Sequence, residues 1–223
     1  MKLQEYPDRD LLMLDLADTI TGELADALRR NERATLCVPG GTTPGPVFDV
    51  LAEQALDWDR VDVVLNDERW VPEDHSRSNT RLLREKLFVS KASGANLIPL
   101  YAPEPTPEAA LDALGEALAA HLPISVLLLG MGADMHTASL FPGADNLEAA
   151  LDDHAPPLMA MRAEAAGEPR VTLTAPVLNG AISKHILITG REKREALERA
   201  AQLSPEQAPI RAVWSDATVH WAE

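Results

Sequence analysis

The sequence predicts an α/β fold: a Rossmann-like, mostly parallel sheet with helices on both faces. Three observations support this fold class. Short apolar segments alternate with longer helical segments along the chain. The apolar segments lack a regular polar alternation, which is typical of strands buried on both faces. Several of them end at a glycine-rich or polar loop, and such loops form the ligand-binding edge of a parallel sheet.

The first predicted helix spans 11–30, where an apolar residue recurs at every fourth position and so lines one helix face. These residues are Leu12, Leu16, Ile20, Leu24 and Leu28. A β-prone segment at 34–38 then ends at a glycine-rich turn. A helix follows at 44–54, because proline is well placed in a first helical turn. This part of the chain is therefore a strand, a glycine loop and a helix.

The same order of elements continues to the end of the chain. An apolar strand at 61–65 precedes a polar loop at 66–75. Further helices are expected at 79–88, 106–121 and 192–202, and further strands at 97–100, 124–129, 158–161 and 185–189, with 213–221 as a terminal segment. Because carboxyl ends of parallel strands share one edge, the loops after Val38, Leu65 and Leu129 are expected to converge.

Length and composition predict one domain, 1–223, since 46% of the 223 residues are apolar. Acidic residues outnumber basic ones 35 to 20, and the net charge of -15 disfavours nucleic acid and anionic membranes as partners. No apolar run reaches the roughly 18 residues of a membrane helix. The single cysteine, Cys37, is expected to be buried, and a reducing, cytoplasmic location is expected. The chain is expected to be a monomer or a small homo-oligomer.

The segment PGGTTP at 39–44 has the properties of a phosphate-binding loop. Gly40 and Gly41 allow the backbone to approach an anion, Thr42 and Thr43 add hydroxyl donors, and a helix N-terminus follows. The segment lacks the spacing of a Walker A or a dinucleotide-binding loop. An ordinary turn is the alternative on local grounds.

A second candidate, NDERWVP at 66–72, directly follows an apolar strand. Asp67, Glu68 and Arg69 place two carboxylates and a guanidinium at the expected sheet edge. Arginine suits bidentate phosphate contact, whereas a solvated charged turn is the other interpretation. Two further cations, Arg170 and Lys193, are candidates of the same type with weaker local signals.

The segment GMGADMHTASLFPG at 130–143 follows the most apolar strand and contains a candidate general base, His136. Asp134, two residues earlier, could orient the ring and keep it basic. Ser139 lacks the flanking glycines of a nucleophile elbow. The remaining histidines are scattered without metal-ligand spacing, so no metal is expected.

Together, PGGTTP at 39–44, NDERWVP at 66–72 with SN at 78–79, GMGADMHTASLFPG at 130–143 and RVTLT at 170–174 resemble the 6-phosphogluconolactonase family. That family lies within the glucosamine-6-phosphate isomerase/6-phosphogluconolactonase superfamily, and the order and spacing match over nearly the whole chain. The resemblance implies the fold of glucosamine-6-phosphate deaminase and ribose-5-phosphate isomerase. It also implies hydrolysis of 6-phosphogluconolactone in the oxidative pentose phosphate pathway, without a cofactor.

By the same resemblance, His136 corresponds to the family's proposed base, and Arg69 and Lys193 correspond to its phosphate or substrate contacts. Gly41, Thr42 and Asp67 fall in its substrate-cleft motifs. The sequence departs from the family at two positions: Thr42 replaces the usual serine, and Met135 replaces the usual glycine before the histidine. A methionine at a positive φ would cost roughly 1 kcal/mol and could displace the histidine.

Two other functions are compatible with parts of the sequence. The first is a glucosamine-6-phosphate deaminase or isomerase, but the related deaminases have a glutamate where this chain has Phe141. The second is a non-catalytic sugar-phosphate-binding protein, against which the presence of His136 and Asp134 argues. An assay with both sugar phosphates separates the three possibilities.

Overall fold

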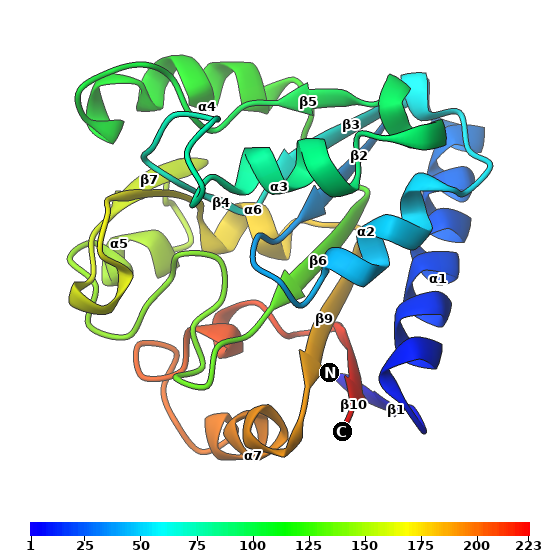
Figure 1. Cartoon of the computed structure of the whole chain (residues 1–223). Coiled ribbons are helices and arrows are strands. Elements are labelled where there is room, and N and C mark those ends of the chain that lie inside the picture. Colours follow the sequence, from blue (N-terminus) through cyan, green and yellow to red (C-terminus); the bar gives the residue numbers. More distant parts are fainter.

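The main sheet of the computed structural model has seven parallel strands (Figure 1). The structure describes the backbone of residues 1–223 and every side chain except that of residue 165. In spatial order the strands are β1 (Lys2–Glu5), β10 (Thr218–Ala222), β9 (Ser183–Thr189), β6 (Val126–Gly130), β2 (Ala34–Val38), β3 (Val61–Leu65) and β5 (Asn96–Ile98). The predicted Rossmann-like, mostly parallel α/β fold is confirmed.

The strand order reverses in the middle of this sheet. From β2 the chain proceeds to β3 and β5 on one side, and then returns to place β6, β9 and β10 on the other. The loops that leave β2 and β6 therefore diverge to opposite faces and open a crevice at the carboxyl ends of the two strands. Ligands bind at such switch points in open α/β sheets.

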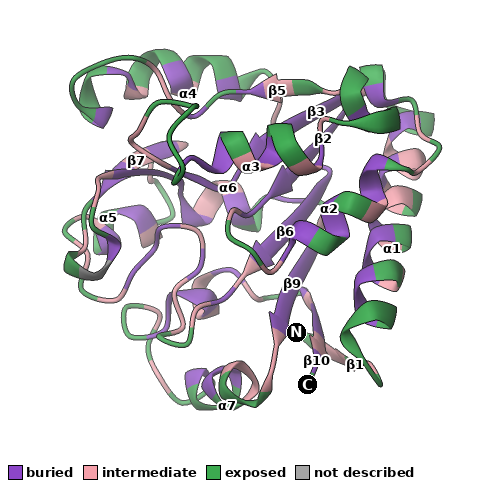
Figure 2. Ribbon diagram, viewed as in Figure 1, coloured by how far each residue is buried: buried purple, intermediate pink, exposed green. Residues whose placement is uncertain are grey.

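Burial explains why the sheet strands are almost purely apolar. All five residues of β2 and of β3 are buried, as Figure 2 illustrates for the central strands. The helix α1 (Arg9–Arg30) packs its apolar face against β2, β6 and β10, and its expected stripe from Leu12 to Leu28 is buried. Asp8 caps the helix by accepting a hydrogen bond from the Leu11 amide at 2.8 Å.

The other helices flank the sheet (Figure 1). They are α2 (Gly45–Ala52), α3 (Asn79–Lys86), α4 (Leu111–Ala119), α5 (Leu147–Leu151), α6 (Ala175–Asn179) and α7 (Arg191–Ala200). Single 3₁₀ turns occur at Trp58–Arg60, Ser90–Gly94, Pro107–Ala109, Glu164–Ala166 and Pro209–Ala212. No helix among the described residues is long and apolar enough to cross a membrane.

A second, antiparallel sheet was not predicted. Its strands are β4 (Asp67–Arg69), β8 (Arg170–Leu173) and β7 (Leu158–Met161), in that order. The prediction of a polar loop at 66–75 was therefore wrong for Asp67–Arg69. These three charged residues carry no β signal of their own and become a strand only by pairing with β8, about a hundred residues further along the chain.

The sequence located most elements of the main sheet within a few residues. Strands at 34–38, 61–65 and 158–161 have the predicted bounds, although the third belongs to the small sheet. The helix expected at 106–121 is broken, with a 3₁₀ turn before a shorter α4. In the terminal segment predicted at 213–221 the strand begins only at Thr218, and it extends to Ala222; β1 was not predicted. Cys37 is buried, as expected.

Candidate active site

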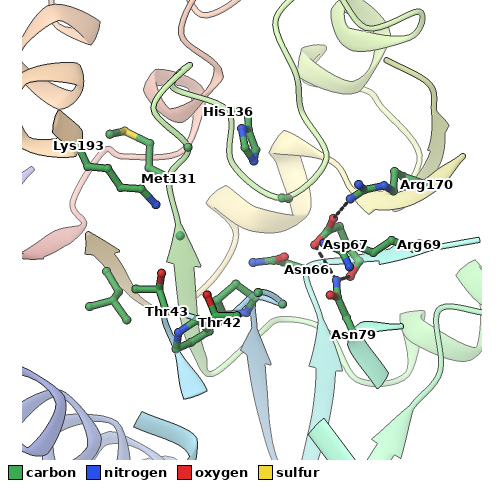
Figure 3. Close-up of a pocket in the computed structure, with 18 residues that line it drawn as sticks. Thr42, Thr43, Asn66, Asp67, Arg69, Asn79, Met131, His136, Arg170 and Lys193 are labelled. Carbon is green, nitrogen blue, oxygen red and sulfur yellow. Dashed lines mark hydrogen bonds and ion pairs between the residues drawn. The ribbon is translucent and has the colours of Figure 1, made fainter. Parts of the chain in front are cut away.

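A cleft of about 300 Å³ lies at the carboxyl ends of β2, β3 and β6, so the predicted convergence of their loops is confirmed (Figure 3). Nine of the eleven predicted site residues line it: Gly40, Gly41, Thr42, Thr43, Asp67, Arg69, His136, Arg170 and Lys193. In Figure 3, Lys193 and Met131 lie on one side, Asp67, Arg69 and Arg170 on the other, and His136 opposite Thr42 and Thr43. The cleft thus places cationic groups on both sides of a histidine.

The glycine-rich loop between β2 and α2 forms one wall. Gly40 is required by close packing, because a Cβ there would lie 2.0 Å from Asn79 Oδ1. Gly41 has a φ of +84°, a conformation that side-chain-bearing residues rarely adopt. Thr42 and Thr43 follow and line the cleft before α2 begins. The backbone of this loop is consistent with close approach of an anion.

Asp67 is the centre of a buried cluster on the small sheet. Its Oδ2 atom accepts a hydrogen bond from Ser139 Oγ at 2.6 Å and lies 3.5 Å from Arg170 Nη1. The side-chain Nδ2 of Asn79 donates to the backbone oxygen of Asp67 at 3.0 Å. Strand pairing holds Asp67 next to β8, which carries Arg170. A carboxylate and an arginine from distant segments therefore meet in one wall of the cleft.

Arg69 and Arg170 both reach the cleft with part of the guanidinium unsatisfied. Arg69 Nη1 donates to the Arg77 backbone oxygen at 2.5 Å, whereas Arg69 Nε is buried without a partner. Arg170 Nε is likewise unpartnered among the described residues. Burial lowers the pKa of Arg170, and the neighbouring charge of Arg69 acts in the same direction, whereas Asp67 opposes it. These arginines are suited to an incoming anion.

Glu68 does not line the cleft, although we predicted a substrate contact. Its side chain is fully buried and points to the start of α3, where its carboxylate accepts hydrogen bonds from the Asn79 and Thr80 amides at 2.8 and 2.7 Å. Burial raises the pKa of Glu68 despite these bonds. A carboxylate at a helix N-terminus is a stabilising cap. Glu68 thus holds α3 in place, and with it Asn79.

The loop after β6 is folded tightly around His136. Met135 has a φ of 67° and Ala138 a φ of 50°, and Gly132 is held so close that a Cβ would lie 2.2 Å from His136 Nδ1. The Gly132 amide donates to the His136 backbone oxygen at 3.0 Å, and the Met135 amide donates to the Gly132 oxygen at 2.9 Å. The loop therefore keeps a left-handed residue at 135 even though that residue is methionine.

The predicted contact between Asp134 and His136 is present. Asp134 Oδ1 lies 2.5 Å from His136 Nδ1, and this hydrogen bond lowers the pKa of Asp134. An ionised carboxylate at Nδ1 holds the proton on that nitrogen, which leaves Nε2 of the neutral ring as a proton acceptor. The ring of Phe141 packs beside the imidazole, with 4.5 Å between the ring centroids. Asp134 does not itself line the cleft.

Lys193 enters the cleft from the first turn of α7. Burial lowers the pKa of Lys193, whereas the nearby charges of Glu192 and Asp134 raise it. No described residue forms an ion pair with the Lys193 ammonium group at 4.0 Å or less. A half-buried cation of this kind is available to a negatively charged ligand. The predicted location of Lys193 at the sheet edge is confirmed.

Several lining residues were not among those we predicted, notably Asn66, Asn79 and Met131. Asn66 is fully buried, and its Oδ1 atom has no partner among the described residues. Asn66 lies directly between the end of β3 and Asp67, and this position is the sequence feature that could have identified it as a cleft residue. Asn79 directly follows Ser78, the N-cap of α3. It lines the cleft because it packs against Gly40, and no local sequence pattern predicts that contact.

The fold and the cleft define a Rossmann-like α/β enzyme that binds a small anionic molecule beside a carboxylate-bound histidine. Comparison with known proteins identifies its relatives. Residues 7–221 match the family described as glucosamine-6-phosphate isomerases/6-phosphogluconolactonase. The chain belongs to this family.

Individual relatives cover nearly the full length. A 6-phosphogluconolactonase from Rhizobium meliloti is 42% identical over 93% of this chain and 92% of its own. One from Pseudomonas aeruginosa is 39% identical over 92% of this chain and 88% of its own. The crystal structure of a 6-phosphogluconolactonase from Shewanella baltica superposes with a TM-score of 0.97 at 32% identity, covering 100% of this chain and 98% of the other. The resemblance read from the sequence motifs is confirmed.

Proposed function

We propose that this chain is a 6-phosphogluconolactonase that hydrolyses 6-phosphoglucono-1,5-lactone to 6-phosphogluconate, with His136 as the water-activating base. The observation that carries the proposal is the pair formed by Asp134 and His136 at 2.5 Å, on a loop that faces a cleft with cations on both sides. The names of the relatives support the same substrate. The reaction belongs to the oxidative pentose phosphate pathway.

The chemistry begins at His136 Nε2. This nitrogen takes a proton from a water molecule while the water oxygen attacks the lactone carbonyl carbon. Asp134 stabilises the imidazolium that forms, because its ionised carboxylate accepts a hydrogen bond from the Nδ1–H group. The tetrahedral intermediate collapses with cleavage of the bond to the ring oxygen, and the imidazolium returns a proton to that leaving oxygen. Water is the only co-reactant, and the protons balance.

Binding of the phosphate relies on local positive charge. The chain as a whole carries a net charge of -15 and repels an anion, so the cleft must concentrate cations against that field. Lys193 lies on one side of His136, and Arg69 and Arg170 lie on the other. Together with the backbone of the PGGTTP loop, these groups are candidates for holding the phosphate and the developing oxyanion.

Phe141 disfavours deamination of glucosamine 6-phosphate. Ring opening and isomerisation need an additional group that transfers protons, and a phenyl ring cannot do so. Phe141 instead packs on His136 and lies under the Arg170 guanidinium, 5.7 Å from the ring centroid. This position therefore contributes packing rather than acid-base chemistry.

The experiment that tests the proposal offers freshly prepared 6-phosphogluconolactone and glucosamine 6-phosphate separately. Acid release is followed for the lactone, with the spontaneous rate subtracted, and ammonia release is followed for the amino sugar. We expect acid release well above the spontaneous rate and no ammonia. Ammonia release would select the deaminase. Binding of either compound without product would select a non-catalytic sugar-phosphate-binding protein.

A further inference from the structure

One carboxylate oxygen in the cleft wall has two competing donors. Asp67 Oδ2 accepts a short hydrogen bond from Ser139 Oγ at 2.6 Å, while Arg170 Nη1 stays at 3.5 Å from the same oxygen. All three side chains are buried. The usual distance of a charge-assisted contact between a guanidinium and a carboxylate is about 2.7–2.9 Å. The neutral hydroxyl therefore has the shorter contact with this oxygen, and the cation is left short of a full ion pair.

Arg170 has few other partners to compensate its charge. Its Nη2 donates to the Ala166 backbone oxygen at 3.1 Å and lies 3.8 Å from Glu168 Oε1. Its Nε has no partner among the described residues. A buried cation that is incompletely paired is strongly attracted to the nearest carboxylate. Among the described residues the nearest carboxylate is that of Asp67, and the Ser139 hydroxyl donates to the same oxygen.

We propose that Ser139 is a positioning residue: its hydroxyl occupies Asp67 Oδ2 and thereby keeps Arg170 from closing onto Asp67. The guanidinium then stays available to the phosphorylated substrate. This inference rests on the proposed function, in which Arg170 is one of the cations that hold the substrate. A displacement of less than about 1 Å at such a group is enough to weaken substrate positioning substantially.

Several hydrogen bonds that anchor the His136 loop do not involve the Ser139 hydroxyl. The Ser139 backbone amide donates to Thr172 Oγ1 at 3.2 Å, and the Leu140 amide donates to the Thr137 oxygen at 3.0 Å. Thr137 Oγ1 also donates to the Gly130 oxygen at 2.8 Å. None of these bonds uses the Ser139 side chain. Removing the hydroxyl should therefore leave His136 in place and change the contact between Asp67 and Arg170.

The test is Ser139→Ala in the full chain, with two readouts. Calorimetric binding of 6-phosphogluconate should weaken about tenfold, the size expected for one hydrogen bond to a charged group. The KM for 6-phosphogluconolactone should rise by a similar factor, with kcat within about threefold. Unphosphorylated glucono-1,5-lactone should be hydrolysed by the variant and the parent with equal kcat/KM.

The same measurements with Arg170→Ala and the double variant form a cycle. We expect Ser139→Ala to cost about tenfold alone and almost nothing in the Arg170→Ala background. An equal loss in both backgrounds, or a fall in kcat with unchanged KM, would overturn the proposal. If Ser139→Ala folds poorly, Ser139→Cys takes its place in the cycle. A thiol is only a weak hydrogen-bond donor, so we expect the same loss of binding from Ser139→Cys.

Ser125→Ala is the matched control, because it removes another buried serine hydroxyl, one that accepts a hydrogen bond from the Thr35 amide at the opposite end of the sheet. It should leave product binding unchanged. A parent protein without lactonase activity would refute the proposed function, whereas the calorimetric cycle would still decide the role of Ser139. The two failures are therefore distinguishable.

Discussion

Buried polar groups are fully hydrogen-bonded at the start of strand β3 and incompletely hydrogen-bonded at its end. At its start, Asp62 accepts hydrogen bonds from Arg33 at 2.7 and 2.9 Å, from Asn96 at 2.9 Å and from His121 at 2.9 Å. Burial alone would raise the pKa of Asp62, but these bonds outweigh it and hold the pKa at about 2. At this end of β3, hydrogen bonds therefore more than offset the cost of burying the Asp62 carboxylate.

At the other end of β3 the polar groups are left incomplete. Four buried side-chain N or O atoms of the described residues lack a hydrogen-bond partner, and three of them belong to Asn66, Arg69 and Arg170, which line the cleft. The same region contains the left-handed residues Met135 and Ala138. Unsatisfied buried groups cost about 1–3 kcal/mol each. This cost is concentrated beside the cleft, and the one such atom elsewhere among the described residues is Arg211 Nε.

The largest stability effect should come from the compensated end. Asp62→Ala removes the buried carboxylate that accepts hydrogen bonds from Arg33, Asn96 and His121, and the loss of these bonds should lower the free energy of unfolding by about 3 kcal/mol. The activity of the folded fraction should not change. Chemical denaturation and lactone hydrolysis check the two parts. The control is Asp57→Ala, which removes an exposed ion pair with Arg60 and should cost less than about 0.5 kcal/mol. Equal costs for both variants would contradict the comparison.

A partly buried chain of hydrogen bonds connects α1 to the sheet. Tyr6 Oη lies 2.8 Å from His220 Nδ1, His220 Nε2 lies 3.0 Å from His185 Nδ1, and His185 Nε2 lies 2.8 Å from Glu23 Oε2. Burial, followed by the charge of His185, lowers the pKa of His220 to about 4. His220 is therefore neutral in the folded protein across most of the acidic range.

This shift predicts a loss of stability in acid. Between pH 6.5 and 4 the unfolded chain binds a proton at His220 that the folded chain does not, so the free energy of unfolding falls as pH decreases. The contribution is complete above about pH 6.5, and on the order of 3 kcal/mol is lost by pH 4. The free energy of unfolding, measured by urea titration at each pH, should depend less steeply on pH in His220→Leu than in the parent. Substitution of the exposed His154 by leucine should leave this pH dependence as it is in the parent. An unchanged pH dependence in His220→Leu would refute His220 as the group responsible.

The smallest expected effect concerns the strained residue in the cleft loop. Met135→Gly and Met135→Ala both remove the methionine packing, but only glycine is unstrained at a φ of 67°. The glycine variant should be more stable than the alanine variant by about 1 kcal/mol, measured by thermal denaturation at matched pH. Its kcat should equal that of the parent, since the loop keeps its shape. An alanine variant as stable as the glycine variant would show that position 135 carries no strain.

The sequence located the cleft because strand ends and glycines are local signals. The loops after Val38, Leu65 and Leu129 were identified from short apolar segments followed by polar ones, and parallel strands bring such loops together. His136 and Asp134 are two residues apart, so their contact needed only a tight turn.

What the sequence did not reveal depends on pairing over long distances. Asp67 and Arg170 were each noted, but their contact requires the antiparallel register of β4 and β8. Glu68 lies between two residues that line the cleft, so the sequence predicts a ligand contact for it as well, but strand alternation turns its side chain to the opposite side, toward α3. Ser139 lacked the pattern of a nucleophile, and its bond to Asp67 depends on the fold of the whole loop.

The most direct test of the account is the kinetics of His136→Ala with 6-phosphogluconolactone, corrected for spontaneous hydrolysis. General-base assistance contributes about 10²- to 10⁴-fold, so kcat should fall by roughly that factor while KM changes little. His75→Ala, which alters an exposed histidine outside the cleft, should match the parent. A kcat for His136→Ala equal to that of the parent, or a rise in KM alone, would contradict the assignment of His136 as the base.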